Sequence, residues 1–435
     1  MATAGFAIGL GNIWRFSYLA GQNGGGAWVM VYLLCAILIG IPLFTAEIAM
    51  GRKAQHMPIP AMRILTGGKG GFWTLIGWAG VAAAVLIMSY YLMIIGWIVG
   101  YFIMIAGGHF SGMSADQVSA AFPAFIARPG LVFGYTLVAA AVSAFVVARG
   151  VQHGIERASK ILMPALFVLL LVLLVRAVTF PGAMEGLAWF LKPDFSRLTA
   201  AGVLSAVGQC FFSIGIGMAG GLAFGSYLKP ERTDVPGNAA TVVVFDTAVA
   251  MLAGAVIFPS LFAFGLEPDS GTGLLFATMP NLFERMPAGH FFGALFFLLV
   301  FLAGITSSIA LLEVVSGSVA EKTGWTRGRS AWITVAALLV LQIPVILSQG
   351  PWSDVRVGGR DLFGLVDFIS GDILLPVGGI LVALFAGWAW GFGRFREEAN
   401  RGATWLSVPA AWSPFVRVVI PATVAIILLR GLGLF

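Results

Sequence analysis

Ala7-Ile8-Gly9-Leu10-Gly11 and Ser213-Ile214-Gly215-Ile216-Gly217 repeat one pattern, in which paired glycines interrupt a long apolar stretch. Each glycine costs a helix about 1 kcal/mol relative to alanine and lets the backbone leave helical geometry. In lipid, the peptide groups freed by such a break are satisfied only where they line a polar cavity. The exposed N–H groups of the resulting half-helices favour an anion, and the exposed carbonyls favour a cation. The two segments therefore predict a ligand site between two broken helices.

Close helix packing is the alternative interpretation of these glycines. Gly217 and Gly221 have the GxxxG spacing that lets two membrane helices approach each other. Gly215 to Gly220 also matches GxGxxG, but a dinucleotide site needs a preceding strand, and both flanks here are apolar helix. A binding site is favoured over packing by the polar residues within a turn or two of the glycines, which are Asn12, Arg15, Gln209 and Ser213.

The composition predicts an all-α membrane protein. Of 435 residues, 59% are apolar and 10% are charged, whereas a soluble domain has about a quarter of its residues charged. Apolar runs of about 20 residues can span a bilayer as helix, and these long runs exclude a β-barrel. We expect about eleven spans, near 3–20, 27–50, 72–106, 130–148, 156–178, 203–227, 239–263, 290–320, 330–347, 363–392 and 415–434.

The loops between these spans predict one membrane domain over residues 1–435, with a cytoplasmic amino terminus. This orientation places most Lys and Arg side chains on the cytoplasmic side, as multi-pass proteins of the plasma membrane require. The net charge of +6 then reflects topology and not binding of nucleic acid. Cys35 and Cys210 lie in apolar runs and are predicted to be buried thiols. The sequence contains neither HExxH nor GxSxG, so no hydrolytic activity is indicated, and we do not expect an enzyme.

Ionisable residues at membrane depth are costly and mark candidate functional sites. Asp246 lies early in the seventh predicted span, where its carboxylate must be protonated, paired or neutralised by a cation. Sodium prefers oxygen ligands, which Asn12, Ser213 and Asp246 can supply. Pairing of Asp246 with a neighbouring helix is the structural alternative. The other ionisable candidates are Arg15, Glu47, Glu313 and Asp367, of which the two glutamates also suit a role as interhelical contacts.

Longer motifs resemble the neurotransmitter:sodium symporter family, the LeuT-type transporters. The first-span motif is Gly5-Phe6-Ala7-Ile8-Gly9-Leu10-Gly11-Asn12-Ile13-Trp14-Arg15-Phe16, and the similarity covers nearly the whole chain. The resemblance implies a LeuT-type 5+5 inverted repeat of about eleven transmembrane helices, with spans 1 and 6 discontinuous. Repeat one would cover about residues 1–180, repeat two about 200–392, and an additional helix about 413–434. The later matching segments are residues 23–27, 42–52, 208–213, 303–308 and 367–368.

The resemblance also implies two sodium sites and a substrate site. Sodium site 1 would use the Ala7 carbonyl with the side chains of Asn12, Ser213 and Asp246. Sodium site 2 would use the carbonyls of Gly5, Ile8 and Ala303 and the hydroxyls of Thr306 and Ser307. The substrate carboxylate would meet the N–H groups of Leu10 and Gly11 and the Tyr91 hydroxyl, and its ammonium the carbonyls of Ala7, Phe212 and Ser213. The side-chain subsite would comprise Ile87, Phe212, Gly215, Met218, Ser307 and Leu311, with Arg15 and Asp367 as the external gate.

Gly9 and Ala250 refine the expected substrate and ions. Gly9 stands where monoamine carriers of this family have an aspartate, so the substrate should bring its own carboxylate, as a small neutral amino acid does. The apolar subsite favours a hydrophobic or aromatic side chain. Ala250 replaces a serine that many chloride-dependent relatives have, and Asp246 supplies a fixed negative charge, so chloride is not expected. The resemblance thus implies a sodium-coupled symporter that imports a neutral amino acid by alternating access.

Two other functions compete with symport. Relatives have about a dozen further residues before Gly5, including an arginine and a tryptophan that latch the cytoplasmic gate. A chain with a truncated first helix would suit a substrate-binding sensor or a transport-defective homologue. A passive channel is the remaining alternative, which the enclosed character of the expected site disfavours.

Overall fold

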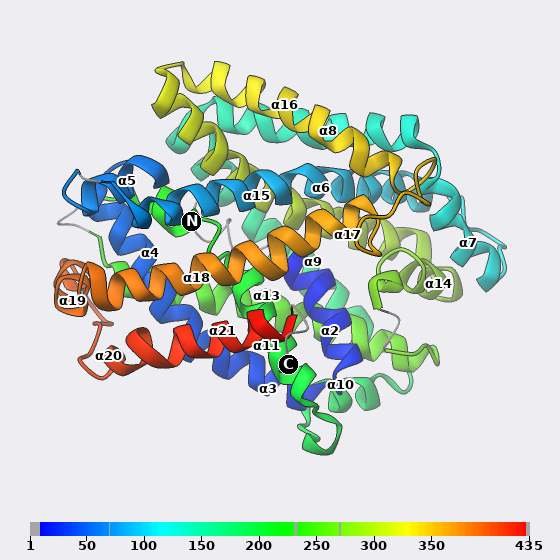
Figure 1. Cartoon of the computed structure of the whole chain (residues 1–435). Coiled ribbons are helices and arrows are strands. Elements are labelled where there is room, and N and C mark those ends of the chain that lie inside the picture. Colours follow the sequence, from blue (N-terminus) through cyan, green and yellow to red (C-terminus); the bar gives the residue numbers. More distant parts are fainter. Residues whose placement is uncertain (1–8, 69, 230–232, 269–270, 432–435) are drawn as a thin grey trace.

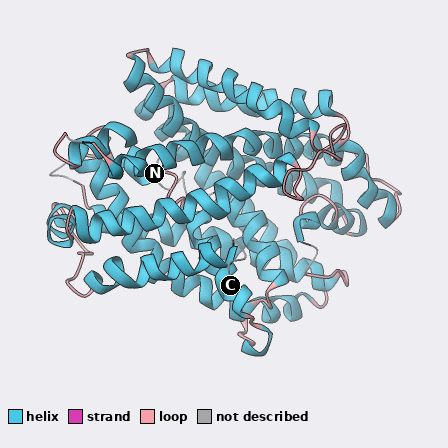
Figure 2. Ribbon diagram, in the orientation of Figure 1, coloured by secondary structure: helices cyan, strands magenta, loops and turns pink. Residues whose placement is uncertain are grey.

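The computed structural model describes residues 9–68, 70–229, 233–268 and 271–431, and these residues fold almost entirely as helices joined by short loops (Figure 2). Within this described part, nine helices are long and apolar enough to cross a membrane. Their bounds are Gly26–Ala54, Phe72–Ala106, Pro129–Ala148, Val151–Val178, Val235–Ala263, Gly289–Thr323, Arg327–Leu347, Leu362–Ala389 and Trp412–Arg430.

The two glycine-containing segments supply the remaining two predicted spans. The first is a π-helical turn, Gly11–Arg15, which continues as α2 (Phe16–Gln22). The sixth consists of α11 (Ala200–Ile214) and α12 (Gly220–Gly225), separated by five non-helical residues. The predicted discontinuity of span 6 is thus found, and the amino-terminal half of span 1 lies outside the described residues.

Glycine conformation explains why span 6 breaks where it does. Gly215 ends α11 in the left-handed region with φ 77°, and its N–H donates to the Phe211 carbonyl at 3.0 Å. Such a left-handed cap is the commonest way for a helix to end, and only glycine adopts it without steric cost. Gly217 follows with φ 84°, and a Cβ there would press against the Leu375 carbonyl of α18 (Leu375–Leu384). The break therefore depends on both glycines of the repeated pattern.

The two longest helices form the centre of the molecule. α6 (Leu75–Ala106) runs beside α15 (Gly289–Thr323), and α8 (Pro129–Ala148) and α16 (Arg327–Leu347) lie together along one edge (Figure 1). Most of α6 and α15 is buried, whereas the outer helices expose apolar side chains, as expected where lipid is the solvent. The segment between α13 and α15 contains a short helix, α14 (Thr278–Arg285).

Short helices complete the chain and connect the spans. They are α5 (Pro58–Leu65), α7 (Ala115–Ile126), α10 (Ala183–Leu191) and α19 (Phe392–Asn400). The break in span 6 and the first described turn of span 1 are buried in the interior, beside residues of α6, α13 (Val235–Ala263) and α15.

Candidate functional site

Gly9 is the first described residue of the predicted site, and Gly5, Ala7 and Ile8 lie outside the described residues. The Gly9 N–H donates to Asn12 Oδ1 at 2.7 Å, and the Asn12 N–H donates to the Gly9 carbonyl at 3.2 Å. These paired bonds fix the Asn12 amide at the start of the first described helical turn. Its other end, Nδ2, consequently points toward α11 and α13.

Asn12, Ser213 and Asp246 form one buried oxygen-rich cluster. Asn12 Nδ2 lies 3.1 Å from Ser213 Oγ, 2.6 Å from Asp246 Oδ1 and 2.9 Å from the Asp246 carbonyl. Ser213 Oγ donates to Asp246 at 2.9 Å. Asn12 and Asp246 have no exposed surface, and 3% of Ser213 is exposed. Three elements far apart in the sequence therefore bring the Asn12 amide nitrogen, the Ser213 hydroxyl and the Asp246 carboxylate to one point.

Tyr32, from the second span, also belongs to this cluster, and the sequence analysis missed it. Its hydroxyl donates to Asp246 Oδ2 at 3.0 Å, and the side chain is fully buried. An aromatic residue inside an apolar run carries no signal of such a role, because packing explains it equally well.

The chemistry of this cluster suits a hard cation. The Asn12 NH₂ group makes three contacts to oxygen, two of them to a buried aspartate, and sodium takes the same kind of oxygen ligands. Rotation of the Asn12 amide would present Oδ1 as a further ligand. A buried carboxylate whose partners are hydroxyls and an amide, and not an ammonium or guanidinium, is otherwise electrostatically costly.

The predicted second sodium site lies on α15, next to Gly9. The Thr306 hydroxyl donates to the Ala303 carbonyl at 2.8 Å, and Ala303, Thr306 and Ser307 are all buried. A Cβ at Gly9 would overlap Ser307 Oγ and press on the Tyr91 hydroxyl. The absence of a side chain at Gly9 is therefore a steric requirement of the contact between the first span and α15.

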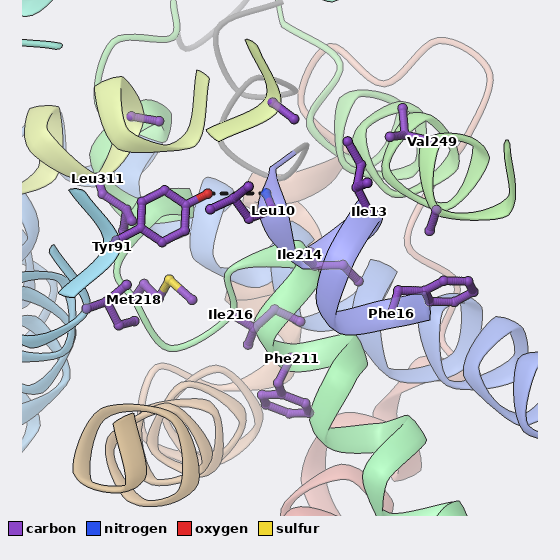
Figure 3. Close-up of a cluster of buried hydrophobic side chains, with 14 of the residues drawn as sticks. Leu10, Ile13, Phe16, Tyr91, Phe211, Ile214, Ile216, Met218, Val249 and Leu311 are labelled. Atoms are coloured by element: carbon purple, nitrogen blue, oxygen red, sulfur yellow. Dashed lines mark hydrogen bonds between the residues drawn. The ribbon is translucent and has the colours of Figure 1, made fainter. Parts of the chain in front are cut away.

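A small cavity of about 30 Å³ lies between the first span and the broken sixth span. Tyr91, whose hydroxyl accepts the Leu10 N–H at 3.2 Å, forms one wall, and Met218 and Leu311 approach from neighbouring elements (Figure 3). All six residues of the predicted side-chain subsite line this cavity, namely Ile87, Phe212, Gly215, Met218, Ser307 and Leu311. The remaining lining residues are Gly9, Gly11, Tyr91 and Ser213. Its side-chain walls are mainly apolar, and its polar groups lie beside Gly9 and Ser213.

A larger cavity of about 330 Å³ adjoins this one and shares Gly11, Tyr91 and Phe212 with it. The larger cavity also has an aromatic lining, which includes Trp14, Tyr18, Trp97, Phe276 and Phe363.

Arg15 and Asp367, the predicted external gate, both line the larger cavity but bond to other residues. Arg15 donates to Gln209 at 2.8 Å and its guanidinium lies 4.7 Å from the centre of the Phe212 ring. Asp367 accepts the Tyr90 hydroxyl at 3.0 Å. Among the described contacts, Arg15 and Asp367 therefore do not bond to each other, although both line the larger cavity.

Glu47 holds the non-helical segment of span 6. Its carboxylate accepts the N–H of Gly217 at 2.8 Å and that of Gly221 at 3.2 Å, and the residue is fully buried on α4 (Ile41–Ala54). The sequence marked Glu47 as an ionisable residue at membrane depth that also suits a role as an interhelical contact. The structure shows that it bonds peptide groups that the glycine break releases.

A second polar cluster lies at the other end of α15. Glu313, which is 1% exposed, pairs with Arg327 at 2.6 Å and accepts the Tyr227 hydroxyl at 2.5 Å. Glu321 contacts His56 and accepts the Met57 N–H at 2.7 Å. Both partners of Glu321 lie in the loop after α4, so this loop is tied to the carboxyl-terminal end of α15.

A family profile for the sodium:neurotransmitter symporter family matches residues 1–111 and 120–433. The chain belongs to this family. A sodium-dependent transporter of Bacillus subtilis (strain 168), YhdH, is 37% identical over 100% of this chain and 96% of its own length. The sodium- and chloride-dependent creatine transporter 1 of Oryctolagus cuniculus is 28% identical over 92% of this chain and 70% of its own length.

The fold is likewise that of a family member of known structure. The crystal structure of MhsT in complex with L-phenylalanine matches with a TM-score of 0.89 and 38% identity, over 99% of this chain and 97% of that one. The LeuT-type architecture predicted from the sequence is thereby confirmed. This symporter-family protein is a sodium-dependent, multi-pass membrane transporter and not an enzyme.

Proposed function

We propose that the protein is a symporter that imports a neutral amino acid with a hydrophobic or aromatic side chain, driven by the sodium gradient. The observation that carries this proposal is the oxygen cluster of Asn12, Ser213 and Asp246 beside a mainly apolar cavity. Gly9 contributes no negative charge to that cavity. A substrate with an ammonium group should therefore bring its own carboxylate, as an amino acid does. MhsT, the structural neighbour, was crystallised with such a substrate, L-phenylalanine.

Asn12, Ser213 and Asp246, with the Ala7 carbonyl, would hold the first sodium ion next to the substrate carboxylate. That ion supplies positive charge where the substrate is negative, so each favours binding of the other. The Leu10 and Gly11 N–H groups and the Tyr91 hydroxyl would orient the substrate carboxylate. The carbonyls of Ala7, Phe212 and Ser213 would accept its ammonium.

Ala303, Thr306 and Ser307, with the carbonyls of Gly5 and Ile8, would hold the second sodium ion. Because these ligands come from both the first span and α15, sodium would tie two elements that separate when the site opens inward. Phe212 would then close over the substrate, and Arg15 and Asp367 would approach each other above it.

Alternating access of this kind requires the two repeats to rock against each other. We place repeat one at about residues 1–180, repeat two at about 200–392 and an additional helix at about 413–434. The amino terminus would be cytoplasmic, which puts the larger cavity on the outer face. Chloride is not required in this scheme, because Asp246 carries the negative charge and Ala250 has no hydroxyl.

The test combines binding and transport with the purified full chain. Binding of each of the twenty amino acids is measured with sodium and with potassium, and the best ligand is then assayed for uptake into liposomes with an inward sodium gradient. We expect sodium-dependent binding of aliphatic or aromatic amino acids, followed by concentrative uptake. Sodium-dependent binding without uptake would support a sensor instead, and uptake that ignores sodium would support a channel.

A further inference from the structure

The turn that follows α18 and the turn that precedes α21 (Ile420–Gly431) carry a basic and aromatic site, far in the sequence from the residues of the substrate cavity. Two widened, π-helical turns meet there, Phe385–Ala389 and Phe415–Val419. A π-turn breaks the regular helical hydrogen-bond series, and such turns are often found at functional sites. The contact is close, because a Cβ on Gly387 would press on the Arg417 backbone and side chain.

Arg417 is fixed at this contact by one edge of its guanidinium. Nε donates to the Gly387 carbonyl at 3.0 Å, and the Arg417 carbonyl accepts the Trp388 indole N–H at 3.1 Å. The guanidinium carbon lies 5.3 Å from the centre of the Trp388 ring. Among the residues that the structure describes, no hydrogen bond or ion pair occupies Nη1 or Nη2 of Arg417.

The surroundings of Arg417 place those two nitrogens at the edge of a bilayer. Arg417 is the sixth residue of the span Trp412–Arg430, roughly 8 Å along the helix from its start. Its neighbour Trp388 is the penultimate residue of the span Leu362–Ala389, so the two residues meet near the ends of their spans, where acyl chains give way to headgroups. Trp388 is 61% exposed and Val418 is 57% exposed, so an indole ring and an aliphatic side chain border the guanidinium. Tryptophan at this depth is typical of a membrane interface.

We propose that Arg417 and Trp388 bind the phosphodiester of an anionic phospholipid, with the lipid's acyl chains along Val418 and Val419. Arginine's terminal nitrogens match the two free oxygens of a phosphodiester in a bidentate arrangement, which lysine cannot reproduce. The Gly387 carbonyl holds the guanidinium in place before the lipid arrives, which reduces the entropy lost on binding. A free inorganic phosphate would make the same polar contacts but none along the exposed valines, which is why the site is assigned to a lipid.

Phosphatidylglycerol is a suitable probe for the purified full chain in a neutral detergent. Lipid binding is followed by native mass spectrometry and by the rise in melting temperature, with phosphatidylcholine and inorganic phosphate in parallel. We expect phosphatidylglycerol alone to bind and stabilise the protein. Arg417→Gln should weaken that binding roughly tenfold, the size of losing one charge-assisted pair of hydrogen bonds. Arg430→Gln, on the same helix, is the matched control and should bind like the unaltered protein.

Three outcomes would overturn the proposal. These are unchanged lipid binding by Arg417→Gln, equal weakening by Arg430→Gln, and equal stabilisation by inorganic phosphate. If Arg417→Gln cannot be purified, Arg417→Lys gives the same test with the positive charge retained. A single ammonium cannot bond both the Gly387 carbonyl and a phosphate in a bidentate manner, so its affinity should still fall, and an unchanged affinity contradicts the assignment.

Discussion

Gly9 shows how one missing side chain determines the geometry of the substrate site. A Cβ there would overlap Ser307 Oγ, which belongs to α15. We therefore expect Gly9→Ala to separate the first span from α15, at a cost of about 1–3 kcal/mol for overpacking, and to weaken substrate binding at least roughly tenfold. Gly134→Ala on α8 is the control, because a Cβ there meets no atom within 4 Å. Equal substrate affinities for the two variants, measured by equilibrium binding, would contradict this explanation.

The negative charge of Asp246 is a second property that a single substitution can test. Asp246→Asn keeps the size of the side chain but removes the negative charge from the cluster with Asn12, Ser213 and Tyr32. We expect sodium-driven uptake either to be lost or to become dependent on chloride, which would replace the missing charge. Uptake is measured in liposomes containing either chloride or gluconate, with Asp354→Asn, an exposed carboxylate, as the control. Full activity of Asp246→Asn without chloride would refute the role proposed for this charge.

Local motifs predicted the individual site residues better than they predicted their partners. Asn12, Ser213 and Asp246 could be grouped in advance because glycine breaks and a lone carboxylate at membrane depth are both unusual. Tyr32 could not, since a buried aromatic residue needs no functional explanation. Gln209, which bonds Arg15, was visible only as a polar neighbour of the break. Side-chain pairs of this kind depend on packing between distant spans, which no local pattern specifies.

At the scale of the elements, apolar length predicted the spans because lipid admits few alternatives to a continuous helix. The predicted segment 72–106 agrees with the observed Phe72–Ala106, and 239–263 begins only slightly late compared with Val235–Ala263. The break in span 6 was predicted by its glycines, but the left-handed conformation of Ala219, with φ 56°, was not. Ala219 lies directly before α12, and tertiary packing, not the intrinsic preference of alanine, determines its backbone conformation.

Glu47 tests whether the broken segment of span 6 needs a fixed acceptor. Glu47→Gln retains the shape but replaces one carboxylate oxygen with a donor, so one of the N–H groups of Gly217 and Gly221 loses its partner. A buried unpaired donor costs about 1–3 kcal/mol, so we expect substrate affinity to fall roughly tenfold or more. Glu284→Gln is the matched control, because Glu284 accepts the Gly112 N–H at the protein surface. Calorimetric binding of the best substrate measures both, and equal affinities would show that the Glu47 charge is dispensable.

Across the whole molecule, the larger cavity at one face and the polar cluster around Glu313 at the other belong to the same conformation. The cavity reaches Phe212 while Arg15 and Asp367 bond elsewhere, and Glu313, Arg327 and Tyr227 connect three elements at the opposite face. In a rocking mechanism one face opens as the other closes, so contacts that hold one face closed also favour the open state of the other. In the orientation proposed above, the larger cavity would open to the outside, and the Glu313 cluster would lie at the cytoplasmic face.

This coupling predicts that a change at the inner face alters access at the outer one. Phe363 lines the larger cavity. A Phe363→Cys variant in which Cys35 and Cys210 are replaced by serine therefore offers a single thiol, which a membrane-impermeant reagent can label. Arg327→Gln leaves the buried Glu313 without its cation, which weakens inner closure because an uncompensated buried charge costs several kcal/mol. We expect Arg327→Gln to slow labelling of the Phe363→Cys thiol severalfold, and substrate with sodium to slow it in the parent protein. Asp354→Cys, exposed on a surface loop, should label at the same rate in both backgrounds. If neither Arg327→Gln nor substrate changes the labelling rate of the Phe363→Cys thiol, the two faces open independently. An alternating-access carrier cannot behave in that way.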